Sequence, residues 1–177
     1  MRSVAEHKPA TVRTEQIILF RASSEIFAIS SGSVQEVRSV DSVTGSPVTI
    51  SEPSLTKVRH ALRRGDKNIY IVNTATHFGL RASSPALIFL LRKSRVALLI
   101  DSIEKMTTMT RLQALPGAFC HQERVWYRGL TVLDQNVIPV VNPNGFLTAD
   151  ELFLLDAATG TGNVPELAGS RGAELSV

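Results

Sequence analysis

The sequence has a single cysteine and no long apolar run. Because Cys120 is the one cysteine in 177 residues, no disulfide can form within the chain, and a reducing compartment is the simplest expectation. The longest apolar run, ALIFLL at residues 86–91, is too short to span a bilayer. The N-terminal stretch MRSVAEHKPATVRTEQ lacks the apolar core of a secretion signal. These absences predict a cytoplasmic protein without direct membrane insertion.

The sequence also lacks the spacings that mark catalytic, metal or phosphate-loop sites. No two of its histidines have a metal-ligand spacing. Cys120 and His121 are adjacent, and neighbours on a strand point to opposite faces, so they form a poor catalytic pair unless a loop brings them together. No pair of carboxylates has a spacing that signals acid–base chemistry. We therefore expect a protein that is not an enzyme and has no cofactor or metal.

The net charge of +3 is too small to indicate nucleic-acid binding by itself. The basic residues concentrate in KVRHALRRGDK, residues 57–67. A solvated basic face and a docking site for an acidic partner both fit this segment. Nucleic acid is the weaker interpretation, because no aromatic side chains interleave with the charges to stack on bases.

Short apolar runs fill the middle of the chain, and polar ends flank them. Residues 1–14 are polar and unpatterned, and residues 157–177 are rich in small residues, so we expect a flexible tail at one end and a disordered tail at the other. Between them, runs such as IILF, IFAI, NIYIV and VIPVV are separated by turn-forming or charged residues. Many short strands at close spacing indicate an all-β sandwich or barrel.

One helix is predicted, in the segment LTADELFLLDAA. Thr148 can cap its first turn, and Glu151 three residues later completes a capping box. Leu147, just before the cap, can pack on Leu152. We expect this helix to cover an open end of the β structure.

The sequence repeats itself at a constant offset of 69 residues, so that EIFAISSGSVQEV (25–37) corresponds to SRVALLIDSIEKM (94–106). We call this shift the repeat offset. The two segments share their apolar positions, and the same offset aligns LF at 19–20 with IF at 88–89 and IVN at 71–73 with VVN at 140–142. Two similar β units are predicted, at about 15–84 and 85–153. The duplication either enlarges the core or creates a groove between two units that binds a partner.

Five segments, in this order, resemble the CheW-like coupling proteins of bacterial chemotaxis. The resemblance covers about residues 15–158, which we expect to form one CheW-like domain ending near residue 156. It rests on LFRASSEIFAISSGSVQEVRSVDSVT (19–44), RRGDKNIYIVNTATHFGL (63–80), VALLIDSIEKM (96–106), YRGLTVLDQNVIPVVN (127–142) and DELFLLDAA (150–158).

This resemblance implies a fold and a function. The fold is all-β: two similar, intertwined, five-stranded SH3-like β-barrels around a shared core, with a short C-terminal helix. The function is that of a non-catalytic scaffold, which couples the signalling tip of methyl-accepting chemoreceptors to the regulatory domain of the CheA histidine kinase. The receptor's helical hairpin would lie in the groove between the barrels, and the kinase would contact barrel ends. The protein would sit in receptor arrays at the inner membrane face, with no nucleic-acid partner.

The resemblance also assigns candidate residues. Val34, Glu36 and Val37 match the family's V-x-E-V element at the receptor-binding groove, and Ile100 and Ile103 match the facing edge from the second half. Arg64 resembles the arginine of the family's L-R-G turn at the rim, which is needed for coupling. For the aliphatic residues among these, plain core burial is the alternative.

The chain departs from the family pattern near that turn. RHALRRG has Arg63 where leucine is expected, and Tyr70 and Asn73 replace the proline and aspartate of the following strand. Two alternative functions therefore stay open. One is a divergent CheW-like adaptor in another receptor–kinase pathway, and the other is a small β-barrel binder of nucleic acid or an anionic ligand through residues 57–67.

Overall fold

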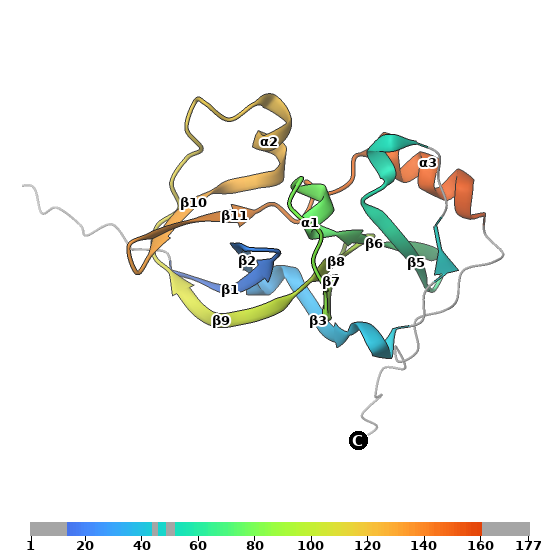
Figure 1. Ribbon diagram of the computed structural model, residues 1–177, viewed down its shortest axis with the longest axis horizontal. Coiled ribbons are helices and arrows are strands. Elements are labelled where there is room, and N and C mark those ends of the chain that lie inside the picture. Colours follow the sequence, from blue (N-terminus) through green and yellow to red (C-terminus); the bar gives the residue numbers. More distant parts are fainter. Residues whose placement is uncertain (1–13, 44–45, 49–51, 161–177) are drawn as a thin grey trace, which may run out of the picture.

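A computed structural model describes residues 14–43, 46–48 and 52–160, and its strands form two sheets (Figure 1). Sheet A contains, in spatial order, β10 (Tyr127–Leu133), β11 (Asn136–Val141), β2 (Glu25–Ser30), β1 (Glu15–Ala22) and β9 (Ser102–Met109). Sheet B contains β3 (Val34–Ser39), β7 (Leu87–Leu91), β8 (Val96–Ile100), β6 (Lys67–Asn73), β5 (Val58–Arg64) and β4 (Ser46–Pro47).

Each sheet is assembled from both halves of the chain. Sheet A joins β1 and β2 to three strands from the second half, and sheet B joins β7 and β8 to strands from the first half. When each strand of sheet A is replaced by its equivalent at the repeat offset, the order β10-β11-β2-β1-β9 becomes β5-β6-β8-β7-β3. This is the order of sheet B without β4, counted from its other edge. The expected intertwining is therefore present.

The expectation of two five-stranded barrels holds in part. Sheet A has five strands and sheet B has six, and neither ladder closes on itself within the described residues. Sheet B nevertheless curls, as a hydrogen bond from Arg64 Nη1 at the end of β5 to Gln35 of β3 shows. The two atoms are 3.0 Å apart, although three strands separate β5 from β3 in the ladder. A side-chain hydrogen bond thus bridges the gap that a backbone ladder would close in a barrel.

The repeat predicts most strand positions but not all. The start of β5 shifted by the repeat offset is the start of β10, and the same holds for β6 and β11. In the hairpins, however, Leu19 pairs with Ala28, and Leu90 rather than Ile88 pairs with Ala97, the equivalent of Ala28. The strand β7 is thus displaced by two residues from its aligned position. A two-residue shift keeps every side chain on its original face, which is why the apolar pattern does not reveal it.

The alternation of side chains divides the apolar interior into three clusters. One lies within the curl of sheet B and includes Leu62, Ile69 and Leu90. A second lies within sheet A and includes Ile17 and Val140. The largest lies between the sheets and takes residues from both, among them Phe20, Phe27, Tyr70, Phe89 and Leu98. We call this third cluster the shared core.

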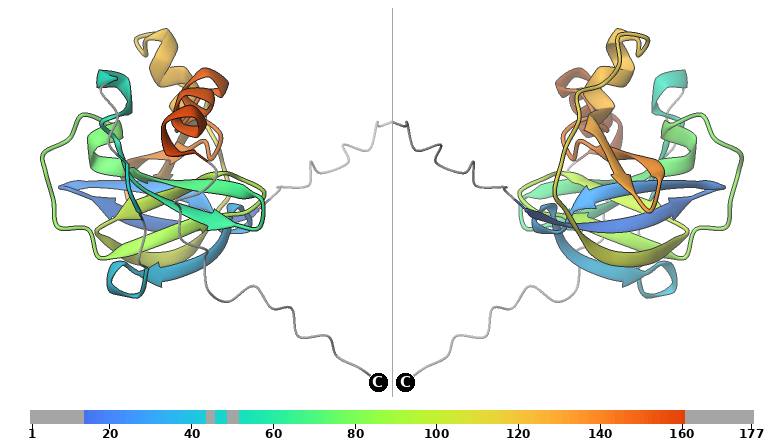
Figure 2. Two further views of the ribbon diagram at one scale, coloured as in Figure 1. Left: turned by 90° about the vertical axis from the view of Figure 1, so that its right-hand side faces the viewer. Right: turned by 90° about the vertical axis from the view of Figure 1, so that its left-hand side faces the viewer.

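Short helices connect the strands, and all three α-helices gather on one side of the sheets, opposite β3 (Figures 1 and 2). The described helices are η1 (Ser31–Ser33), η2 (Val40–Ser42), η3 (Pro53–Leu55), α1 (Thr74–His77), α2 (His121–Trp126) and α3 (Ala149–Thr159). The sequence pattern predicts only α3 among them. Its capping box is confirmed: Thr148 Oγ1 accepts from the Glu151 backbone N–H at 3.1 Å, and Glu151 Oε2 accepts from the Thr148 N–H at 2.8 Å.

A polar network fixes α3 to the end of sheet B. The Tyr70 hydroxyl donates to Asp156 at 2.6 Å, and Arg95 forms a two-pronged contact with the same carboxylate. The helix extends to Thr159, past residue 157, where the disordered tail is expected to begin. Thr159 Oγ1 lies 3.1 Å from the Tyr70 hydroxyl. Residues 1–13 and 161–177 of the two expected tails lie outside the described residues.

Candidate partner-binding surfaces

A β-bulge shapes the edge strand that carries the V-x-E-V element. In β3, Val34 pairs with Leu91 and Glu36 pairs with Leu90, so Gln35 is the extra residue. On a regular strand, residues three apart point to opposite faces. The bulge instead places Val34 and Val37 on the same face of sheet B. Their cross-strand neighbours on that face are Leu91 and Phe89 of the shared core.

The edge of sheet A repeats this arrangement. In β9, Ile103 pairs with Phe20 and Lys105 pairs with Leu19, so the extra residue is Glu104, the repeat equivalent of Gln35. Ile103 and Met106 therefore share the face of Phe20 and the shared core. The equivalent bulges bring two pairs of apolar side chains to corresponding positions on the two sheet edges.

Burial separates the expected groove residues into two kinds. Val34 is 9% exposed and Ile100 is fully buried, and both belong to the shared core. Val37 and Ile103 are 41% and 36% exposed, and Met106, which is not among the sequence candidates, is 62% exposed. We call Val37, Ile103 and Met106 the apolar edge. Val34 and Ile100 support this surface from beneath, and a partner could touch only its exposed members.

Polar residues lie beside the apolar edge of β3. Glu36 forms an ion pair with Arg38 at 2.7 Å, and Arg64 bonds to the bulge residue Gln35. The fold therefore brings Arg64 next to the V-x-E-V element, although Gln35 and Arg64 are 29 residues apart in sequence. The structure places Arg64 at the rim of the expected surface.

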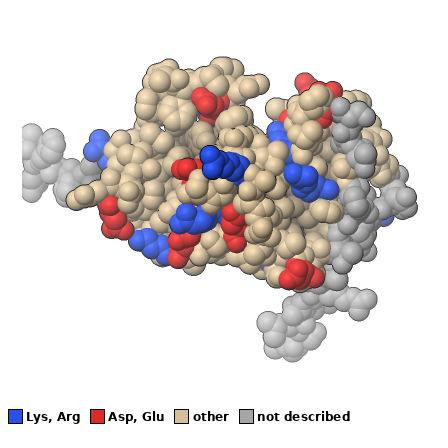
Figure 3. Space-filling view, viewed as in Figure 1, with Lys and Arg blue, Asp and Glu red and all other residues tan. Residues whose placement is uncertain are grey.

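The basic segment 57–67 does not form one continuous face. Lys57 pairs with Glu151 at 2.9 Å, with both side chains largely buried, so it helps to hold α3. Arg63 donates from Nε to the Gly65 carbonyl at 2.9 Å. Basic and acidic side chains are interspersed on the face seen in Figure 3. The segment as a whole therefore does not present the continuous basic face that would favour nucleic-acid binding.

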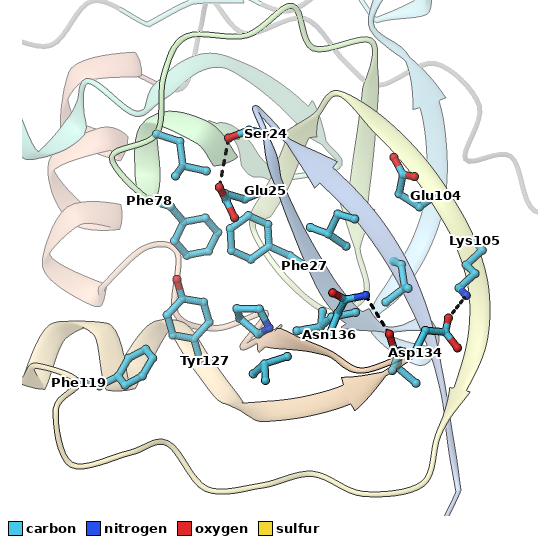
Figure 4. Close-up of a pocket in the computed structure, with 17 residues that line it drawn as sticks. Ser24, Glu25, Phe27, Phe78, Glu104, Lys105, Phe119, Tyr127, Asp134 and Asn136 are labelled. Carbon is cyan, nitrogen blue, oxygen red and sulfur yellow. Dashed lines mark hydrogen bonds and ion pairs between the residues drawn. The ribbon is translucent and has the colours of Figure 1, made fainter.

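A hollow of about 760 Å³ opens over sheet A, and no pattern in the sequence indicates it (Figure 4). Phe27, Phe78 and Tyr127 stack along its inner side, with ring centroids 4.6 and 5.4 Å apart. Burial, together with the charge of Glu123, raises the pKa of Tyr127 to about 12. At the rim, Lys105 pairs with Asp134 at 3.0 Å. The hollow combines an apolar floor with a polar rim, which suits a protein partner or an apolar ligand.

A second hollow, of about 360 Å³, lies between α2 and the start of α3, where Figure 3 shows a notch in the surface. His77 lies beneath it, and burial, with a smaller effect of Lys57, lowers its pKa to about 3. The imidazole is therefore neutral at physiological pH. Its Nε2 has no hydrogen-bond partner among the described residues.

Cys120 of the adjacent Cys–His pair lies at the start of a helix. Cys120 is exposed and caps α2, whose residue Glu123 accepts from the Cys120 backbone N–H at 2.9 Å. No group of three or more potential metal ligands occurs in the described parts of the chain. Among those parts there is also no helix with the length and apolarity needed to cross a membrane.

Comparison with known proteins identifies the family. A model of the CheW-like domain matches residues 16–151, which is most of the chain. The chain belongs to the CheW-like domain family. The structure is also similar to that of the scaffolding protein TtCheW from Thermoanaerobacter tengcongensis, with a TM-score of 0.64 at 16% identity, covering 87% of this chain and 99% of that one. No curated protein matches the sequence.

That neither sheet closes within residues 14–43, 46–48 and 52–160 does not weaken the assignment to the CheW-like family. The family match confirms the interpretation from the five sequence segments. At 16% identity, the similarity to TtCheW shows the fold alone.

Proposed function

We propose that this CheW-like protein is a non-catalytic adaptor that couples chemoreceptor signalling tips to the CheA histidine kinase. Membership of the family supports a scaffold role. The observation that carries the more specific proposal is the apolar edge, where Val37, Ile103 and Met106 emerge at equivalent bulges of two different sheets.

The apolar edge has the chemistry of a helix-binding surface. A helix presents apolar side chains in a stripe, and exposed aliphatic side chains with charged neighbours can bind such a stripe and set its register. Arg64 and Glu36 supply charged groups on the side of β3. A receptor helix across the apolar edge would bury side chains that are now 36–62% exposed.

The kinase contact is proposed at the ends of the two sheets. The hollow over sheet A offers exposed Val137 and the half-buried Phe119, and a hairpin or loop of the kinase regulatory domain could cover them. Because Val137 and Phe119 are not part of the apolar edge, both partners could bind together. In this role the protein would be cytoplasmic and held at the inner membrane face only through its partners.

Titration calorimetry tests this proposal with the purified chain, the CheA regulatory domain and a soluble receptor-tip fragment from the same cell. We expect micromolar binding of both partners, little weakened when salt is raised, because the proposed contacts are mainly apolar. Met106→Asp should abolish tip binding and leave kinase binding intact. Val137→Asp should do the reverse.

A divergent adaptor in another receptor–kinase pathway is the second candidate, and the departures from the family pattern bear on it. Tyr70 is fully buried and bonds to Asp156 of α3, so its replacement of proline is explained by internal structure. Asn73 caps α1, because its side chain accepts from the Thr76 N–H at 3.0 Å. Neither change lies on the proposed partner surfaces, so neither argues against the chemotaxis role.

A further inference from the structure

The end of sheet B carries a concentration of positive charge, of which the proposed adaptor role uses only Arg64. A hollow of about 320 Å³ there is lined by Arg64, Lys67, Lys93 and Arg95, together with Ile69 and Ser94. These residues come from the β5–β6 hairpin and the β7–β8 hairpin, which β6 and β8 hold side by side in a parallel pair. We call this feature the cationic hollow. Its lining contains four basic side chains and no carboxylate.

Most of this charge is not neutralised within the described part of the chain. Lys67 and Lys93 are exposed and form no ion pair there. Arg64 gives one hydrogen bond, to the uncharged Gln35, and its Nε has no acceptor. Arg95 is the exception, because it pairs with Asp156. Asp66 and Asp156 line an adjoining hollow of about 250 Å³, together with Arg63, Lys67 and Arg95.

The internal repeat provides a comparison within the same molecule. Shifted by the repeat offset, the residues of the cationic hollow become Leu133, Asn136, Ile138, Ser24, Glu25 and Ile26, all of which line the apolar hollow over sheet A. The equivalent positions thus carry four positive charges at one end of the fold and one negative charge at the other. The fold does not require these cations, since the equivalent residues of sheet A form the same hairpins without them.

We propose that the cationic hollow is a binding site for a phosphate group. Lys67 and Lys93 supply point charges, and the guanidinium of Arg64 has unused donors and is held in place by Gln35. With Arg95 paired to Asp156, Arg64, Lys67 and Lys93 remain as three positive charges, and a doubly charged oxyanion neutralises two of them. A single carboxylate would leave most of that charge unpaired. The phosphate could belong to a free solute or to a lipid headgroup, since either presents the same oxygen atoms.

Amide NMR of the labelled full chain, titrated with inorganic phosphate at constant ionic strength, tests the proposal. We expect saturable shifts confined to residues 64–69 and 93–95. The double variant Lys67→Gln/Lys93→Gln should bind about tenfold or more weakly, since it loses two charge-assisted contacts. Both lysines are exposed, so the variant keeps its fold. Lys105→Gln, which removes the same kind of charge at the opposite end, should bind phosphate like the wild type.

A second arm separates the two sources of phosphate. Co-sedimentation with phosphatidylcholine vesicles, with and without about one-third phosphatidylglycerol, shows whether a lipid phosphate is bound. Retention that depends on the anionic lipid and on Lys67 and Lys93 would assign the site to a headgroup. Saturable phosphate binding without retention would assign it to a free solute. The proposal fails if the shifts do not saturate, if they spread over all basic residues, or if the double variant and Lys105→Gln respond alike. No receptor or kinase is used, so the outcome is independent of the proposed function.

Discussion

Aspartate substitutions at Val34 and Val37 separate support of the binding surface from contact with a partner. The two residues share one face of β3, but Val34 is 9% exposed and Val37 is 41% exposed. Val34→Asp places a carboxyl group in the shared core, against Leu91. Loss of a buried valine costs about 1.5–3 kcal/mol, and burial of an unpaired acid adds a further ~1–3 kcal/mol.

The total for Val34→Asp is therefore about 2.5–6 kcal/mol, a large part of the ~5–15 kcal/mol that stabilises a typical domain. In a chain of this size each kcal/mol lowers the midpoint of thermal unfolding by about 2–4 °C, so a decrease of about 5–24 °C is expected. Val37→Asp adds a charge to a side chain that already contacts water. It should cost about 1 kcal/mol or less and yet abolish binding of the receptor tip.

Thermal unfolding followed by circular dichroism, with calorimetry of tip binding, measures both effects. Val132→Asp is the matched control, because Val132 is 48% exposed on β10, away from the apolar edge. It should change neither quantity appreciably. Equal stability of the Val34 and Val37 variants would show that Val34 is not a core residue. Normal tip binding by a folded Val37→Asp protein would refute the assignment of the apolar edge.

Three further predictions concern the rim, the helix and a buried histidine. Arg64→Glu should weaken coupling of receptor and kinase in a reconstituted kinase assay without a loss of stability above about 1 kcal/mol, and unchanged kinase control would remove Arg64 from the rim. Tyr70→Phe should lower the free energy of unfolding, measured in urea, by about 1–2 kcal/mol because Asp156 loses a hydrogen bond. Tyr127→Phe should be nearly neutral, because the Tyr127 hydroxyl has no hydrogen-bond partner among the described residues. Burial lowers the pKa of His77 to about 3, whereas the unfolded value is near 6.5. Between these values the unfolded chain binds a proton that the folded chain does not, so the stability that His77 contributes is complete above pH 6.5 and is lost as the pH falls towards 3. The slope is about 1.4 kcal/mol per pH unit, and His77→Gln should remove it between pH 6.5 and 5; an unchanged slope would exclude His77 as its source.

Features that depend on local pattern could be predicted from the sequence, whereas those that depend on how strands meet could not. The repeat, the capping box of α3 and the family followed from apolar spacing and short motifs. The two-residue shift between β1 and β7 escaped because it preserves side-chain alternation. The shared face of Val34 and Val37 escaped because a bulge is a property of the pair of strands, and nothing in VQEV marks Gln35 as the extra residue.

Burial was the least predictable property of the candidate site. Val34 and Ile103 occupy equivalent positions in the repeat, yet one lies in the shared core and the other is 36% exposed. The exposure of an aliphatic residue on an edge strand depends on what the rest of the fold places over it, and the sequence of the strand does not show this. The contrast between the cationic hollow and the apolar hollow has another origin. The charges of the equivalent hairpin residues are visible in the sequence, but only the fold shows that these residues line one hollow in each half.

The central claim is that one protein binds a receptor tip and the kinase at separate surfaces, and calorimetry of ternary assembly tests it most directly. The chain saturated with the CheA regulatory domain is titrated with the receptor-tip fragment, and the same titration is repeated with Met106→Asp. The account predicts micromolar tip binding to the binary complex, with a dissociation constant close to that of the free chain, and its loss in the variant. Failure of the wild-type chain to bind either partner, or mutually exclusive binding of the two, would contradict it.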